Sequence, residues 1–253
     1  MKFWNRKNKI EFFHNEPSII ENFPIIESKD LKLNWVHKTK QDYQNIVKEG
    51  SNPLFLHLSR CPGIFDLFKY GYIVSLHKDI LVKPESNTNF KCQVMRDKLP
   101  PEDEWIGGFR ITDQIQSRNL ITNPPWAKDF IIKIDTGWNV IVPKGLKLIM
   151  LPIAYPDTFD FTSTIGILDP AISTEVNFQI FWNGTESETL IKAGTPLGQI
   201  IPLSEKKYQM VQRYMNQQDR EWIVKTKNLK NSTFWRYTVR KKMVNMYNKY
   251  WKR

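Results

Sequence analysis

Cysteine is scarce in this chain of 253 residues, which contains only Cys61 and Cys92. The spacing of the two residues does not require a disulfide, so we expect reduced thiols, as is usual in the cytoplasm. Long apolar runs are also missing. No stretch approaches the roughly 20 residues that cross a bilayer, and the first residues do not resemble a signal peptide. We therefore expect a cytoplasmic protein without a membrane span.

Acidic residues are missing from the last part of the chain, where no Asp or Glu follows Glu221. Lys and Arg are frequent there, so this tail holds most of the net charge of +11. Aromatic residues interleave with the cations, a composition that suits phosphate backbones and stacked bases. The residues expected to contact nucleic acid or an acidic protein partner are Trp235, Arg236, Arg240, Lys241 and Lys242.

Three other interpretations of the tail stay open. Its aromatic residues could pack a helix on the body of the protein while the cations extend into solvent. The tail could dock on an acidic protein in an assembly, or lie on a membrane surface as an amphipathic helix. Charge alone does not distinguish these partners.

Composition and periodicity predict a globular α+β protein with a β-rich core. Hydrophobic residues make up 41% of the chain and aromatic residues 13%, which is typical of a folded protein. We expect a mixed α/β part over residues 1–128, a β core over residues 129–204 and a basic helical tail over residues 205–253. The three could also form one continuous domain.

Turn residues divide the middle of the chain into short strands. Two strands, over residues 130–134 and 138–142, are expected to flank a turn at Asp135-Thr-Gly137, where glycine allows a positive φ. Pro143-Lys-Gly145 predicts a second turn, which leads into a strand over residues 146–151.

Elsewhere the pattern alternates between helix and strand. Spacing and glycine predict helices that end near Gly50 and Gly71, and alternation predicts a single strand over residues 72–83. From residue 205 the period becomes helical, and a second helix is expected over residues 234–251. The residues that would share one face of the first of these helices are Tyr208, Val211, Tyr214 and Met215.

Three motifs follow one another in the β core: Gly166-Ile-Leu-Asp169, the alternating segment 176–182 with Asn183 after it, and Leu197-Gly-Gln199. Their order resembles the core of the dUTPase and dCTP-deaminase superfamily. The resemblance implies a β-clip or jelly-roll-like core and a homotrimer with sites between subunits. It also implies that Asp169 activates the attacking water, that Gly166 and Gln199 bind nucleotide, and that a hydrolase would use Mg²⁺.

Four positions depart from the pattern of that superfamily. Ile172 stands where an aromatic residue packs on the base, Thr174 replaces a glycine, and Pro196 replaces an arginine. Gln179 occupies the position of the catalytic base of dCTP deaminases, and an amide cannot take up a proton as a carboxylate does. We therefore expect a non-catalytic binding or assembly module, with an active nucleotide pyrophosphohydrolase or deaminase as the alternative.

Two further segments, residues 61–74 and 130–157, resemble proteins from marine tailed phages and some bacteria that carry no assigned activity. This resemblance implies a phage-type protein that works in the cytoplasm of a host cell.

His77 and Asp79 have the spacing found in non-haem iron sites, which combine two histidines with one carboxylate. On a strand, both side chains would point to the same side. His14, His37 or His57 would have to supply the other ligand. An iron-dependent oxygenase is therefore a further alternative for the function. The structural interpretation of His77 and Asp79 is that they lie on a solvated face of a strand. Asp169 likewise has a structural alternative, as the cap of an Asp-Pro turn.

Overall fold

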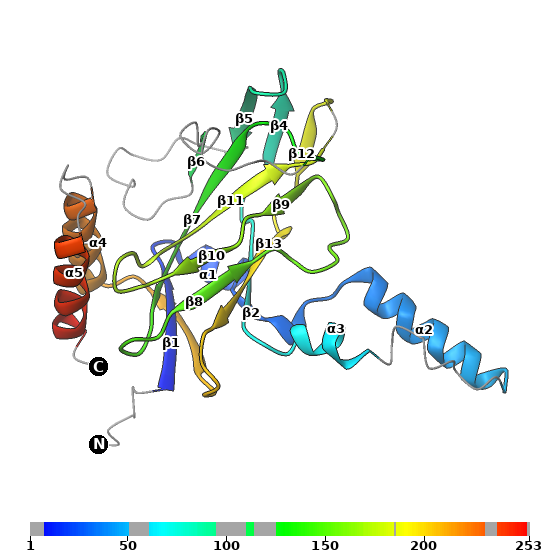
Figure 1. The fold of residues 1–253 in the computed structure, drawn as a ribbon, viewed down its shortest axis with the longest axis horizontal. Coiled ribbons are helices and arrows are strands. Elements are labelled where there is room, and N and C mark those ends of the chain that lie inside the picture. Colours follow the sequence, from blue (N-terminus) through cyan, green and yellow to red (C-terminus); the bar gives the residue numbers. More distant parts are fainter. Residues whose placement is uncertain are drawn as a thin grey trace.

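The computed structural model describes residues 8–50, 61–94, 110–113, 125–184, 186–230 and 237–251. The fold is mixed α+β with a predominance of strands, as the composition predicted (Figure 1). Of the helices in the described ranges, none has the length and apolar character needed to span a membrane.

The largest sheet has six strands and contains elements from the beginning, middle and end of the chain. Its order is β14-β1-β7-β11-β9, and β6 pairs with β7 at residues 132–135, before the part of β7 that pairs with β1. β1 and β14 are parallel, whereas the other pairs are antiparallel. The strands are β1 (Lys9–His14), β6 (Arg110–Asp113), β7 (Ile131–Ile141), β9 (Phe161–Ser163), β11 (Glu175–Trp182) and β14 (Gln209–Tyr214).

Two smaller sheets complete the β structure. The five-stranded sheet has the order β10-β8-β13-β3-β2, and the three-stranded sheet has the order β12-β4-β5. Their strands are β2 (Ile26–Glu27), β3 (Tyr72–Ser75), β4 (Ile80–Pro84), β5 (Phe90–Val94), β8 (Leu148–Leu151), β10 (Gly166–Leu168), β12 (Thr189–Ile191) and β13 (Pro196–Pro202).

One core joins the three sheets. Phe12 and Phe178 from the six-stranded sheet, Val74 and Ile200 from the five-stranded sheet, and Val82 from the three-stranded sheet belong to one buried cluster. All five side chains are at most 1% exposed. Burial of this apolar surface is the main stabilising contribution to the fold.

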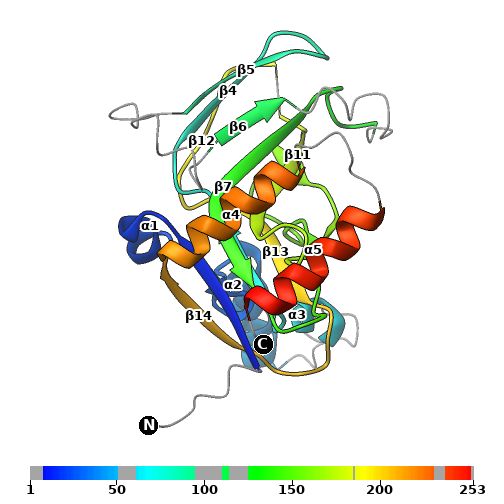
Figure 2. The same ribbon diagram turned by 90° about the vertical axis from the view of Figure 1, so that its left-hand side faces the viewer.

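Two helices near the end of the chain cover the other face of the six-stranded sheet. α4 (Gln217–Lys230) and α5 (Tyr237–Tyr250) lie side by side there (Figures 1 and 2). Phe13, next to the core residue Phe12, points to this opposite face and packs with Trp222 of α4 and Tyr247 of α5. Strand alternation therefore directs Phe12 toward the core and Phe13 toward the opposite face.

The other helices lie away from this layer. They are α1 (Pro17–Asn22), the 3-10 helix η2 (Ser28–Asp30), α2 (Asn34–Lys48) and α3 (Pro62–Leu67). α2 projects from the body (Figure 1), and the ring of Trp35 at its start lies against Phe65 and Phe68. Gly71 ends the α3 segment with a φ of 77°, and a Cβ there would collide with the backbone of Ile200.

The turn predicted at Asp135-Thr-Gly137 is wrong, because β7 runs without reversal through these residues. Gly137 has a φ of 74°, and the register with β11 shifts between Glu175 and Asn177. The positive φ therefore marks a β-bulge within one long strand rather than a chain reversal. Pro143-Lys-Gly145 does form the expected turn, with Gly145 at a φ of 79°.

The helix predicted from residue 205 is also wrong in its first part, since Gln209–Tyr214 is the edge strand β14. It pairs with β1 in continuous parallel register, and the Gln212 side chain bonds both the amide and the carbonyl of Ile25. Tertiary pairing therefore overrides a helical spacing of apolar residues.

The single strand predicted over residues 72–83 is divided between two sheets. β3 ends at Ser75 and β4 begins at Ile80. Between them, Leu76 exchanges backbone hydrogen bonds with Gly194 and Thr195, which ties this corner to the segment before β13.

Candidate functional site

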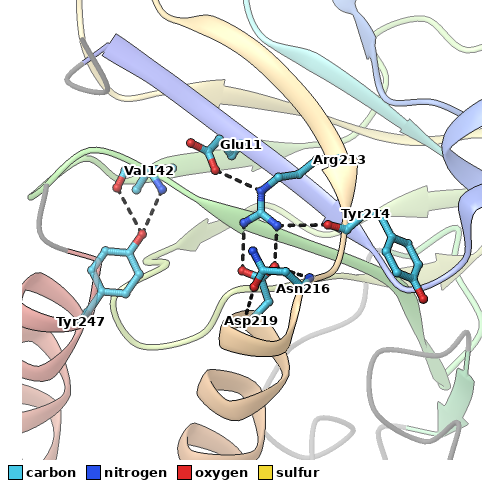
Figure 3. Close-up of polar contacts among 7 residues, drawn as sticks. All are labelled: Glu11, Val142, Arg213, Tyr214, Asn216, Asp219 and Tyr247. Atoms are coloured by element: carbon cyan, nitrogen blue, oxygen red, sulfur yellow. Dashed lines mark hydrogen bonds and ion pairs between the residues drawn. The ribbon is translucent and has the colours of Figure 1, made fainter. Parts of the chain in front are cut away.

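The site begins with the way α5 is fixed to the body. The hydroxyl group of Tyr247 accepts a hydrogen bond from the Val142 amide at 2.9 Å and donates one to the Val142 carbonyl at 3.2 Å (Figure 3). Tyr247 is only 2% exposed, and Met243 and Trp251 on the same side of the helix are also buried. This apolar side, together with the Tyr247 hydroxyl, docks the helix.

Tyr247 and Tyr250 of α5, and Trp251 directly after it, are therefore committed to packing. Tyr247, Tyr250 and Trp251 all lie within ring contact of Trp222 on α4. Trp235 and Arg236, which the sequence also predicts as contact residues, lie outside the described residues.

α4 is held at its first turn by Arg213 of β14. Its guanidinium donates to both carboxylate oxygens of the fully buried Asp219 and also to Glu11 (Figure 3). Asn216 and Asp219 exchange side-chain and backbone hydrogen bonds, which caps the helix start. The pair of helices is thus anchored at α4 by charge and at α5 by the Tyr247 hydroxyl.

A pocket of about 380 Å³ lies between α5, the turn after β7 and the turn after β10. Its lining combines an apolar wall with cations and amides. The apolar residues are Val142, Pro143, Leu146, Ala171 and Val244, and the polar side chains are Lys147, Asp169, Arg240, Lys241, Tyr247, Asn245 and Asn248.

Asp169 caps the turn after β10, the structural role that the sequence offered for it, and it also lies near two cations. Its Oδ1 accepts a hydrogen bond from the Ala171 amide at 3.2 Å, and its backbone carbonyl accepts from the amides of Ile172 and Ser173. Its Oδ2 lies 4.0 Å from Lys147 Nζ and 3.9 Å from Arg240 Nη2. The carboxylate therefore caps a turn and also lies between a cation of the body and a cation of the tail.

The cations of α5 lie outside its buried side, and Arg240 reaches toward Asp169 of the body. Arg240, Lys241 and Lys242 are exposed, as is Lys249 near the end of the same helix. Lys241, Lys242 and Lys249 also line a second, more open hollow on the outer face of the helix. The sequence of α5 contains no acidic residue, so the helix itself contributes only positive charge to this face.

The other residues predicted from the superfamily resemblance do not line the pocket of Asp169. Gly166 lies on the edge strand β10, and Gln179 is half-buried on β11 opposite Lys133. Gln199 is buried and donates to the carbonyls of Leu67 at 2.9 Å and Tyr70 at 2.6 Å. In this structure, Gln199 thus ties β13 to the end of α3.

The predicted iron ligands His77 and Asp79 face different surroundings. The ring of His77 is buried 5.4 Å from that of His14, whereas Asp79 Oδ1 accepts a hydrogen bond from the Ala193 amide at 2.7 Å. Burial lowers the pKa of His14 to about 4 and that of His77 to about 3. In the part of the chain that the structure describes, no group of three or more His, Cys, Asp or Glu side chains is placed to hold a metal ion. His57 lies outside the described residues.

Lys147 is the residue of the site that the sequence does not indicate. It follows the predicted Pro143-Lys-Gly145 turn, but nothing in the local pattern connects that turn with a helix almost a hundred residues later.

No protein-family model matches this chain, and no curated protein is significantly similar to it.

Proposed function

We propose that the protein is a non-catalytic binding module that holds nucleic acid on the basic face of α5. The observation that carries this proposal is the division of labour on the helix. Tyr247 and Trp251 dock it on the body, and Arg240, Lys241 and Lys242 are left exposed with no acidic residue on the same helix.

Phosphate groups are the ligand chemistry that such a face fits. Each cation that neutralises a backbone phosphate releases a condensed counterion, which makes binding favourable and dependent on salt. Docking by the Tyr247 hydroxyl holds the cations in place before the ligand arrives. Less conformational entropy is then lost on binding than with an unstructured basic segment.

The decisive experiment reverses the charges of the face without removing the helix. We expect the variant Arg240→Glu/Lys241→Glu/Lys242→Glu to lose most of its affinity for a fluorescent oligonucleotide. The slope of log affinity against log salt should fall by about 2, since roughly 0.7 counterions are released per single-strand phosphate contact. Anisotropy titrations at several salt concentrations measure both quantities.

A matched control is available on α2, where Lys38, Lys40 and Lys48 are exposed. Changing these three residues to glutamate alters the net charge by the same amount but leaves the α5 face intact. Equal losses in both variants would contradict a specific role for α5. A surface that selects phosphate groups should bind the oligonucleotide more tightly than polyglutamate. Tighter binding to polyglutamate would therefore overturn the proposal.

We also propose that the strands β7 to β13 form a dUTPase-like framework that belongs to a phage-type homotrimer. The order of the Gly166, Asn183 and Gln199 motifs supports this proposal, together with the strands that contain or border them. Light scattering should give three times the mass of one chain, and a monomer at micromolar concentration would contradict the trimer.

A further inference from the structure

We propose that the bound nucleic acid is single-stranded and that one of its bases enters the pocket beside Asp169. This inference rests on the proposed function and specifies the ligand of the same surface. The base would lie between α5 and the turn after β7, and the phosphates on either side of it would lie at the mouth of the pocket.

The lining of the pocket suits the flat apolar faces of a base. Val142, Pro143 and Leu146 from the body and Val244 from α5 all line this space of about 380 Å³. This volume is near the lower end of the usual range for small-ligand pockets, about 300 to 1,000 Å³. The side-chain amides of Asn245 and Asn248 supply both donors and acceptors, which can bond the polar edge of a base.

The charges set the direction in which a nucleotide would enter. The Asp169 side chain is 16% exposed, whereas those of Lys147 and Arg240 are 47% and 55% exposed. The carboxylate therefore lies deeper than the two cations and repels a phosphate that enters first. A base that enters first leaves its phosphates beside the exposed cations, where they are favoured.

The same geometry selects single strands over duplexes. A base in a duplex would have to leave its stack and its partner, which costs a few kcal/mol. A base in a single strand does not have to break a pair. Arg240 and Lys241 line the pocket, and Lys242 and Lys249 line the hollow that shares Lys241 with it, so an adjoining stretch of strand can be held at the same time.

The test compares a single-stranded oligonucleotide with a duplex of the same sequence. We expect the single strand to bind about tenfold more tightly, the contribution typical of one base held by stacking or apolar contact. The variant Val244→Trp fills the pocket but keeps every cation, so it should lose this preference and retain its affinity for the duplex. Val224→Trp adds the same side chain at an exposed position of α4 and should leave both affinities unchanged.

Crosslinking gives a second measurement on the unmodified protein, which keeps the inference testable if Val244→Trp does not fold. An oligonucleotide that carries a single 4-thiothymidine should crosslink to the segments 142–147 or 240–248. A free mononucleotide should compete only weakly, because it lacks the second flanking phosphate. Crosslinks confined to other segments, or full competition by an equal concentration of mononucleotide, would overturn the inference.

The failure of this inference can be distinguished from failure of the proposed function. If single strand and duplex bind equally and Val244→Trp changes neither, the inference is wrong. The α5 proposal still stands in that case, provided the triple reversal at residues 240–242 weakens binding. If the triple reversal has no more effect than its α2 control, the proposed function fails as well.

Discussion

At the scale of single residues, Asp169 connects the fold with the candidate site. One oxygen of its carboxylate closes the turn after β10, and the other lies near Lys147 and Arg240. Asparagine can keep the first contact, because its side-chain oxygen still accepts from the Ala171 amide, but it removes the negative charge. The substitution Asp169→Asn therefore keeps the hydrogen bond that closes the turn and removes only the charge that attracts Lys147 and Arg240.

We expect Asp169→Asn to raise the affinity for an oligonucleotide about threefold, since partly exposed charge pairs contribute up to about 1 kcal/mol. The unfolding temperature should change little. The alternative, nucleotide hydrolysis or deamination, predicts a different result. Pyrophosphate or ammonia should then be released from dUTP or dCTP with Mg²⁺, and Asp169→Asn should abolish this release. Anisotropy and a product assay on the same two proteins decide between them, and a lower affinity in the variant would contradict our proposal.

His14 and His77 make stability depend on pH. Their pKa values are lowered by burial to about 4 and about 3, whereas an unfolded histidine titrates near 6.5. Above pH 6.5 both states are neutral and stability is at its full value. As the pH falls from 6.5 toward the folded pKa values, only the unfolded chain takes up protons. Stability should therefore decrease by about 1.4 kcal/mol per pH unit for each histidine.

Urea unfolding at several pH values between 7.5 and 4.5 measures this decrease. The variant His77→Leu should lose about half of the slope that the two histidines cause. His37 is exposed on α2, so His37→Gln should leave the slope unchanged. If the dependence of stability on pH had the same slope in the unmodified protein, His77→Leu and His37→Gln, the buried histidine pair would not be its cause.

At the scale of elements, Arg213 links β14 to α4 and to β1. Besides its bonds to Asp219 and Glu11, its guanidinium lies 4.9 Å from the ring centroid of Phe13. Asp219 is fully buried, so removing its partner leaves a carboxylate without its compensating charge. The start of α4 therefore depends on a residue of the neighbouring strand.

We expect Arg213→Met to lower the free energy of unfolding by about 3 to 5 kcal/mol, the usual cost of breaking a buried ion pair from one side. Arg213→Met/Asp219→Asn should recover part of this loss, because the unpaired charge is gone. Chemical denaturation of the variants measures both effects. Arg220→Met, which removes a peripheral contact with the Tyr214 hydroxyl, serves as the control and should cost much less. A double variant no more stable than Arg213→Met would argue against the charge as the cause.

The elements show how far local sequence determines this structure. The strand over residues 175–182 and the turn at Pro143-Lys-Gly145 follow from alternation and turn chemistry. β14 does not, because its strand state depends on pairing with β1 at the other end of the chain. The bulge at Gly137 has the same local signature as a reversal, and only the pairing with β11 decides between them.

The site has the same limit. The sequence singles out Asp169 and Arg240 separately, one from a motif and the other from charge. The 3.9 Å between them, and the arrival of Lys147 at the same carboxylate, result from docking of α5 on distant strands. A local pattern carries no information about that contact.

At the scale of the whole molecule, strands from the three parts of the chain meet in one sheet. β1 comes from the first part, β7 from the second and β14 from the third, and they are neighbours in the order β14-β1-β7. Phe13 of β1 lies under both α4 and α5. The basic face is therefore carried by a layer that depends on both ends of the described chain, so deleting the tail would uncover Phe13 and Ile141. Charge reversal is for this reason a cleaner test than truncation.

The parallel pairing of β1 with β14 has a consequence for biosynthesis. Lys9 pairs with Gln209, so β1 leaves the ribosome about 200 residues before its neighbour does. At a synthesis rate of about 5 to 20 residues per second, this edge waits on the order of 10 to 40 seconds for its partner. α5 emerges later still, so a nascent chain cannot present the basic surface until its first strand has been enclosed. Under the proposed function, nucleic-acid binding would begin only on molecules whose translation has passed that point.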